Sequence, residues 1–172
     1  MTNKYSARVV FWDNQRMCVT SKQQADSLRV GKQKRLPSHI FRFDSKLEFE
    51  VYLHLLKMYP ANRIRRQVPL PLIRKGLCYP RGKPWKIDFA ITWNFNKNHI
   101  YRYVEAKGIV TSDFRNILPV LEQNNPEAFS KLILVFGSSI PTKNRIISNL
   151  LASKKKRDMY TLRTFNLLEK IP

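Results

Sequence analysis

Residues 85–108 read WKIDFAITWNFNKNHIYRYVEAKG, a sequence typical of a β-hairpin. Two runs rich in β-branched and aromatic side chains, 85–95 and 99–105, flank the polar triplet Asn96-Lys97-Asn98. Runs of this composition on either side of a short polar segment predict two paired strands joined by a turn. We therefore expect an antiparallel hairpin whose turn lies at the polar triplet.

Three ionisable residues, Asp88, Glu105 and Lys107, interrupt the apolar pattern of this hairpin. Glu105 and Lys107 are two residues apart, so their side chains leave the same face of a strand. Asp88 comes early in the first strand and the other two come late in the second, which places them at the same end of an antiparallel pair. Two carboxylates and an ammonium on an apolar sheet are costly unless they pair or bind a cation or substrate. The pattern therefore indicates either a functional site or a structural salt bridge between Lys107 and one acid.

The composition bounds the class of protein and its partners. The chain has 172 residues, 43% of them hydrophobic, which is enough for one domain with a real core, with or without an arm. Lys and Arg number 32 against 12 Asp and Glu, giving a formal charge of +20. An excess of this size favours a polyanionic partner, above all nucleic acid, with a ribosome-associated protein or a membrane-surface binder as alternatives.

The cysteines and histidines give no metal-ligand spacing. We expect Cys18 and Cys78 to be free thiols in a reducing cytosol, and we expect no zinc site. The apolar runs are too short to span a membrane, and the N-terminal residues lack the apolar core of a signal peptide. A cytoplasmic protein is therefore expected, in a bacterial or phage-infected cell or associated with the nucleoid.

Residues 1–42 differ from the rest of the chain and are expected to form a basic N-terminal arm or subdomain. A strand at residues 7–12 precedes a polar segment that carries Lys32, Lys34 and Arg35. Spaced positive charges with few acids suit an arm that lies along phosphates, although a solvated surface segment is the alternative.

A helix is predicted to begin near Ser45, which has Glu48 three residues later. This spacing is that of a capping box, in which the serine caps the helix and the glutamate reaches back to an amide. Apolar residues then recur at helical spacing until Pro60. Glu48 is thus either the capping partner or a further carboxylate of the site.

The remaining elements follow from periodicity and from breaking residues. The expected elements are a strand at 63–71, a basic loop at 74–86, a helix from Ser112, a buried strand at 131–137, a helix at 141–153 and a short strand at 159–165. The order of these elements predicts an α/β fold, a central mixed β-sheet flanked by helices.

Other residues have two interpretations each. Six basic residues near the hairpin either contact phosphates or are ordinary solvated charges: Arg65, Arg66, Lys75, Arg81, Lys83 and Lys86. Gln67 is a candidate partner of the site. The run at 154–157 is expected to be a solvated helix end, and Trp12, Trp85 and Trp93 are expected in the core rather than on a base-stacking platform.

The hairpin motif, Ile87-Asp88 followed by Glu105-Ala106-Lys107, resembles that of the PD-(D/E)XK nuclease superfamily, which ends in an acid, any residue and lysine. The likeness extends over residues 43–137. Ser45 with Glu48 on an early helix, and the Gln-x-Pro strand at 67–69, resemble phage-type endonuclease I junction resolvases and the nuclease subunits of heteromeric transposases. Homing endonucleases of the same fold are also similar.

This resemblance implies a restriction-endonuclease-like core at 43–172 and a metal-dependent site. Asp88, Glu105 and the carbonyl of Ala106 are then the expected metal ligands, and Glu48 assists directly or through water. The expected catalytic set is Glu48, Asp88, Glu105 and Lys107, with Lys107 orienting or deprotonating the attacking water. Mg²⁺ is the expected ion, because it prefers hard oxygen ligands and keeps several waters, and Mn²⁺ is expected to substitute.

The expected activity is hydrolysis of phosphodiester bonds in duplex or branched DNA, of the junction-resolving or site-specific homing type. A transposon-end nuclease that needs partner subunits is one alternative, and a non-catalytic nucleic-acid-binding protein is another. Cutting two strands usually takes two sites, so a homodimer or a higher symmetric oligomer is expected, with DNA as partner and no membrane.

Overall fold

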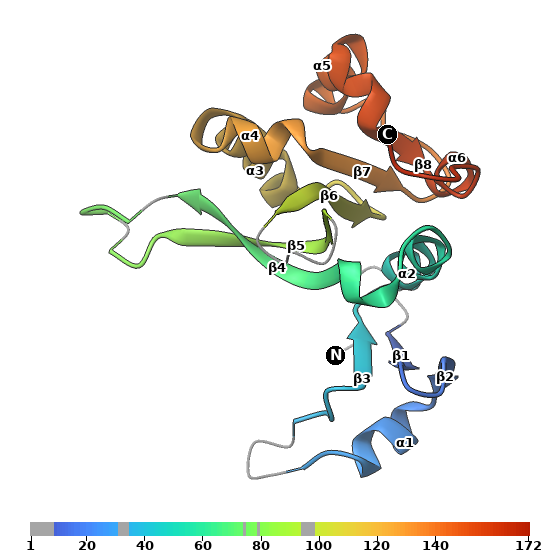
Figure 1. Cartoon of the computed structure of the whole chain (residues 1–172). Coiled ribbons are helices and arrows are strands. Elements are labelled where there is room, and N and C mark those ends of the chain that lie inside the picture. The colour runs from blue at the N-terminus through green and yellow to red at the C-terminus, as the bar shows by residue number, and fades with distance from the viewer. Residues whose placement is uncertain (1–8, 31–34, 74, 79, 94–98) are drawn as a thin grey trace. The chain divides into compact units, whose positions relative to one another are not determined.

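The structure, a computed structural model, describes residues 9–30, 35–73, 75–78, 80–93 and 99–172 (Figure 1). The chain divides into two compact units, Met1–Glu50 and Val51–Pro172. The boundary falls inside helix α2 (Lys46–Met58), eight residues beyond the end of the arm expected at residues 1–42. Each unit is described by itself.

The first unit contains a three-stranded antiparallel sheet in the order β2-β1-β3. Its elements are β1 (Val10–Asp13), β2 (Cys18–Thr20), α1 (Lys22–Ser27) and β3 (Ile40–Phe43). Phe11, Ala25 and Ile40 form its small buried cluster. The sequence predicted one strand and a polar segment; the additional elements arise because local side-chain bonds close them.

Asp13 and Ser21 supply two examples of such local bonding. Asp13 Oδ1 accepts hydrogen bonds from the amides of Gln15 and Arg16 at 2.9 and 3.0 Å, which closes the β1–β2 turn and lowers the pKa of Asp13. Ser21 and Gln24 form a capping box that starts α1. Short polar segments of this kind fold through caps and turns, which apolar periodicity does not detect.

The second unit is built on a mixed five-stranded sheet in the order β4-β5-β6-β7-β8. β4, β5 and β6 pair antiparallel, whereas β6, β7 and β8 pair parallel. The strands are β4 (Ile64–Ile73), β5 (Lys83–Thr92), β6 (Ile100–Lys107), β7 (Leu132–Phe136) and β8 (Met159–Thr161). The predicted α/β class with a mixed sheet flanked by helices is confirmed.

Helices cover both faces of this sheet. One face packs against α3 (Ser112–Asn124), α4 (Pro126–Ser130) and α5 (Arg145–Ala152), whose apolar side chains share one cluster with β7. On the other face, Tyr52 of α2 stacks on Phe89 of β5 and His54 meets Phe165 edge-on. Phe165 belongs to α6 (Leu162–Phe165), and two 3₁₀ helices, η1 (Ala61–Arg63) and η2 (Lys154–Asp158), complete the unit. All five residues of β7 are buried, as the apolar run at 131–137 predicted.

The central hairpin is present as predicted, formed by β5 and β6 in antiparallel register. The turn expected at residues 96–98 lies outside the described residues. β5 begins at Lys83, so Lys83 and Lys86 lie on a strand and not in the expected basic loop. Prolines at residues 80 and 84 indicated a loop, but Pro84 is the second residue of β5, where the strand pairs with the edge strand β4 and the pairing with β6 has not yet begun.

Three further expectations were wrong in detail, two near the C-terminus and one at Trp93. α5 begins at Arg145 and not near Pro141, because Asn144 Oδ1 accepts from the amides of Ile146 and Ile147 and caps the helix there. The last strand stops at Thr161, which caps α6. Trp93 is 54% exposed, whereas Trp12 and Trp85 are buried as expected.

Within the described residues, the helices are too short or too polar to cross a bilayer. Cys18 and Cys78 are free, exposed thiols, which agrees with the expectation of no disulfide.

Candidate active site at the end of the central hairpin

The structure brings Asp88 and Glu105 together at one end of the β5–β6 pair. The amide of Ala106 donates a hydrogen bond of 2.9 Å to Asp88 Oδ2, and the amide of Asp88 donates one of 3.3 Å to Glu105 Oε2. Each carboxylate is therefore anchored on the backbone of the opposite strand. Glu105 is 3% exposed and Asp88 is half-buried, so the pair opens to solvent on the Asp88 side.

Lys107 completes this group. Its Nζ donates to Glu105 Oε1 at 3.3 Å, and it lies 4.7 Å from the ring centroid of Phe114 on α3. A carboxylate on one side and an aromatic face on the other hold the ammonium in place. The Lys107 side chain is still 26% exposed, so a ligand can approach the ammonium.

The backbone of the hairpin is irregular next to Asp88. Ile87 and Ala90 both join the cluster under α3, while Phe89 between them stacks on Tyr52 on the other face. Regular alternation would put Ile87 and Phe89 on the same face. The break at Asp88 turns its carboxylate toward Glu105 and Ala106.

Gln67 of β4 lies opposite this break. Its neighbours Arg66 and Val68 pair with Phe89 and Ile87, and Gln67 itself has φ of 49°. A left-handed conformation is strained for a residue with a side chain, and such strain gathers at functional sites. Gln67 Nε2 also donates to Asp88 Oδ1 at 3.5 Å. The structure thus places Gln67 beside the carboxylate pair.

Glu48 belongs to the first unit and is described there. Its amide is capped by Ser45, with Glu48 N donating to Ser45 Oγ at 3.0 Å. Glu48 Oε2 accepts from the amide of Asp44 at 3.0 Å, one residue before the cap, and the side chain is 4% exposed. The Ser45 cap is therefore confirmed, the glutamate bonds the residue before the cap, and a role for Glu48 in metal binding stays a prediction.

Asp88 and Glu105 are the candidate ligands for a metal ion at this site. No group of three or more His, Cys, Asp and Glu side chains that could hold an ion occurs in the described part of the chain. Mg²⁺ sites commonly use only one or two carboxylates, with waters and substrate phosphates as the other ligands. Asp88 and Glu105 fit that pattern, and the Ala106 carbonyl stays a predicted third donor.

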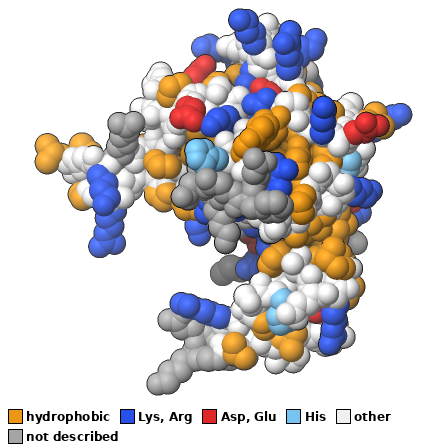
Figure 2. Space-filling view, in the orientation of Figure 1, with side chains coloured by type: hydrophobic (Ala, Val, Ile, Leu, Met, Phe, Trp, Pro, Cys, Tyr) orange, Lys and Arg blue, Asp and Glu red, His pale blue; other side chains and the backbone are white. Residues whose placement is uncertain are grey.

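The basic residues expected at phosphates have different surroundings. Exposed ones are Arg35, Arg65, Lys75, Arg81, Lys83 and Lys86. Arg66 is half-buried with its guanidinium 5.9 Å from the ring centroid of Tyr52, and Lys32 and Lys34 lie outside the described residues. Figure 2 shows many more Lys and Arg than Asp and Glu side chains on the face in view.

A cavity of about 900 Å³ adjoins the candidate site and was not anticipated from the sequence. Its wall runs from Gly108, next to Lys107, through the start of α3 and the β7–α5 connection to the start of α5. Arg115, Lys143 and Arg145 line it. These cations come from separate segments, so their proximity depends on the parallel pairing of β6 and β7 and carries no local sequence signal.

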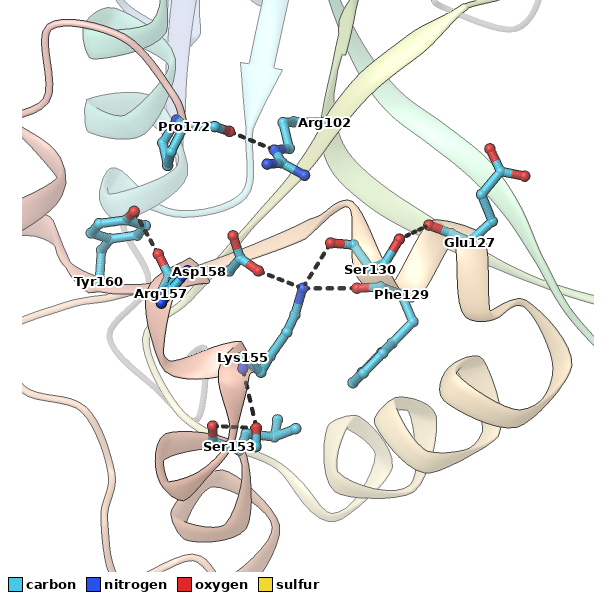
Figure 3. A network of polar contacts seen from close by, with 11 residues as sticks. Arg102, Glu127, Phe129, Ser130, Ser153, Lys155, Arg157, Asp158, Tyr160 and Pro172 are labelled. Atoms are coloured by element: carbon cyan, nitrogen blue, oxygen red, sulfur yellow. Dashed lines mark hydrogen bonds and ion pairs between the residues drawn. The ribbon is translucent and has the colours of Figure 1, made fainter.

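A second lysine–carboxylate pair lies elsewhere in the unit, on η2 (Figure 3). Lys155 Nζ donates to the carbonyl of Phe129 at 2.8 Å, to that of Ser130 at 3.3 Å and to Asp158 Oδ2 at 3.0 Å. Lys155 is 8% exposed, and burial lowers its pKa. The expectation that the whole 154–157 run is solvated was wrong for Lys155, because the end of α4 offers carbonyls that an ammonium can satisfy.

No protein-family model, curated protein or solved structure matches the chain at the level sought.

Proposed function

We propose that this chain is a metal-dependent endonuclease of the PD-(D/E)XK type that hydrolyses phosphodiester bonds in duplex or branched DNA. The observation that carries the proposal is the group at the end of the hairpin, where Asp88 bonds the Ala106 amide and Glu105 bonds Lys107. The formal charge of +20 supports a nucleic-acid substrate.

The fold is compatible with a restriction-endonuclease-like core. An antiparallel meander, β4-β5-β6, continues through α3 into β7, which pairs parallel with β6. This order agrees with the resemblance stated for residues 43–137. In the proposal, the candidate residues sit on the central strands of the sheet, where packing on both faces limits their movement.

Each residue of the group has a proposed role. Asp88 and Glu105 hold Mg²⁺ or Mn²⁺, which when bound supplies an acidic water and charge stabilisation at the phosphate. As an ammonium beside Glu105, Lys107 orients the attacking water and donates to a phosphate oxygen; as the neutral amine, after its proton has passed to solvent, it would deprotonate that water. Gln67 positions Asp88 through its amide. Glu48 is proposed as an additional carboxylate.

The proposed substrate is either a DNA junction or one long recognition site, and a symmetric homo-oligomer would cut the two strands. A transposon-end nuclease would be inactive without its partner subunits. The alternative from another class is a non-catalytic nucleic-acid-binding protein. The 3.3 Å Lys107–Glu105 contact favours this alternative in one respect, because it is also what a structural salt bridge looks like.

The test is cleavage with Mg²⁺ of a supercoiled plasmid, a synthetic four-way junction and a library of genomic fragments. Wild type is compared with Asp88→Ala and Lys107→Ala, and DNA binding is measured in parallel. Glu122→Ala and Lys154→Ala, at exposed positions of the same unit, are the matched controls. Glu48→Gln, with Asp44→Ala as its control, tests the contribution of the helix glutamate.

The proposal predicts that both site variants lose cleavage and retain DNA binding, while the controls cut like wild type. The preferred substrate then separates junction resolution from site-specific cleavage. If wild type binds DNA and cuts no substrate with Mg²⁺ or Mn²⁺, even in the presence of candidate partner subunits, the binding-protein alternative replaces the nuclease.

A further inference from the structure

The cavity beside the candidate site is lined by positive charge. Arg115 comes from the first turn of α3, Lys143 from the β7–α5 connection and Arg145 from the first residue of α5. The residues that line the cavity include no Asp or Glu. Among the described residues, none of the three cations takes part in an ion pair. Three uncompensated cations around one concavity make it a site for an anion.

The lining also indicates what kind of anion would fit. It contains no aromatic side chain on which a nucleobase could stack. The lining includes small residues: Gly108, Gly137, Ser138 and Ser139. The space beside both glycines is open, because a Cβ added at either would meet nothing within 4 Å. Small residues let a phosphate come close to the backbone, and the serine hydroxyls are donors for its oxygens. The chemistry suits a sugar–phosphate backbone better than a base.

The position of the cavity relates it to the carboxylate group. Lys107 and Phe136 are paired at the ends of β6 and β7. The residues that follow them, Gly108 and Gly137, both line the cavity. Phe114, whose ring contacts Lys107 Nζ, is adjacent in α3 to Arg115. The cavity and Lys107 therefore share a wall, and an extended ligand can reach both.

We propose that this cavity binds the phosphodiester backbone of the nucleic-acid strand next to the phosphate held at Lys107. Arg115, Lys143 and Arg145 are the phosphate contacts. The placement of the strand rests on the proposed nuclease function, whereas the binding of a nucleic-acid phosphate in the cavity does not. These three residues are distinct from the basic residues predicted from the sequence.

The experiment measures the salt dependence of DNA binding by the full chain, without divalent metal. Fluorescein-labelled duplex and single-stranded DNA are titrated over a series of NaCl concentrations. The variants are Arg115→Gln/Arg145→Gln and the triple variant that adds Lys143→Gln. Lys154→Gln/Lys156→Gln removes two exposed cations of η2 and is the matched control for lost charge.

The plot of log K against log salt has a negative slope, and each lost phosphate contact lowers its magnitude by about 0.9 on duplex DNA. The proposal predicts that the magnitude of the slope falls by about 1.8 for the double variant and by about 2.7 for the triple variant, at about 0.9 per contact. The control is expected to change the slope by less than half as much. Equal changes in the cavity variant and the control would overturn the proposal.

A second variant tests the cavity without removing any cation. Ser139→Glu adds a carboxylate to the exposed lining, and Ser139→Ala is its neutral control. The proposal predicts weaker DNA binding for Ser139→Glu and nearly unchanged binding for Ser139→Ala. Wild-type affinity in Ser139→Glu would contradict the proposal even if the cation variants bind weakly.

Cleavage of wild type with Mg²⁺ separates this proposal from the proposed function. Cleavage together with an unchanged slope in the cavity variants overturns the cavity site and leaves the nuclease. A reduced slope without cleavage by wild type, even in the presence of candidate partner subunits, overturns the nuclease and leaves a nucleic-acid site in the cavity. Absence of DNA binding by wild type overturns both.

Discussion

The second unit contains two lysine–carboxylate pairs of similar length and opposite character. Lys107 lies 3.3 Å from Glu105 and Lys155 lies 3.0 Å from Asp158. Lys155 also bonds two backbone carbonyls and is almost wholly buried. The Lys107 side chain is 26% exposed, and its acid partner Glu105 accepts a hydrogen bond from the amide of Asp88, whose own carboxylate is only half-buried.

This difference shows how to separate a structural ammonium from a reactive one. An ammonium has three donors, and at Lys155 the protein uses all three within a closed network. At Lys107 the pair stays open to solvent beside a strained strand, so a ligand can replace water there. The length of an ion pair alone would not distinguish the two sites.

The largest expected effect is on the cleavage rate, and it should separate the removal of the Lys107 ammonium from that of the Lys155 ammonium. Lys107→Met should lower the Mg²⁺-dependent cleavage rate by about 10²–10⁴-fold, the usual contribution of a positioned acid–base group. Lys155→Met should cut at the wild-type rate at a temperature where it is folded. Single-turnover assays on the preferred DNA substrate check both. Similar losses in the two variants would mean that the open and closed pairs do not differ in function.

The next effect is on the free energy of unfolding, and it is expected at Lys155 of the closed pair. Lys155→Met should lower the free energy of unfolding by about 3 kcal/mol, because it leaves Asp158 and two carbonyls without their donor. The exposed neighbour variant Lys154→Met should change it by less than about 0.5 kcal/mol. Urea unfolding at neutral pH measures both. Equal stability of the two variants would show that the buried network makes no net contribution.

A smaller effect is expected at Gln67, which has a left-handed backbone beside the open pair. Gln67→Gly should raise the free energy of unfolding by about 0.5–1 kcal/mol, because relief of strain exceeds the added chain entropy. Cleavage should fall about tenfold with the loss of the amide contact to Asp88, the cost of about one hydrogen bond. Gln67→Ala loses the contact and keeps the strain, so it should be less active without being more stable. Equal stability of the glycine and alanine variants would refute the strain.

The smallest effect is the pH dependence of the closed pair. Burial lowers the pKa of Lys155 below its ordinary value of 10.5, so the unfolded chain holds this proton at pH values where the folded chain has released it. Stability of wild type relative to Lys155→Met should therefore rise as the pH increases through the folded pKa toward 10.5. Urea titrations from neutral to alkaline pH test the sign. A relative stability that falls over this range would contradict it.

The sequence predicted the position of the candidate residues well where simple geometry decides it. Period-two alternation put Glu105 and Lys107 on one face, and antiparallel pairing put Asp88 beside them. The break in alternation at Asp88 and the positive φ of Gln67 were not predicted, because period-two alternation assumes a regular strand. Gln67 was expected near the site, but nothing in its sequence context indicates strain.

Tertiary contacts explain why the buried Lys155 and the convergence of Arg115 and Arg145 were not predicted. Lys155 looks like any residue of a basic run until α4 brings its terminal carbonyls to η2. Arg115 and Arg145 lie thirty residues apart and meet only because β6 and β7 run parallel. Local capping explains the late start of α5, where Asn144 is a better cap than the residue before Pro141. The net charge indicates the class of partner and the apolar pattern indicates the helices and strands. Neither indicates which charged side chains come together in the fold.

The placement of the three tryptophans gives each unit its own fluorescence. Trp12 is buried in the first unit, while Trp85 and Trp93 belong to the second, one buried and one largely exposed. A Trp85→Phe/Trp93→Phe chain would emit from Trp12 alone, and a Trp12→Phe chain from the second unit. The emission of these two variants during denaturation would therefore report whether the small β2-β1-β3 sheet and the five-stranded sheet melt in one cooperative transition or in two.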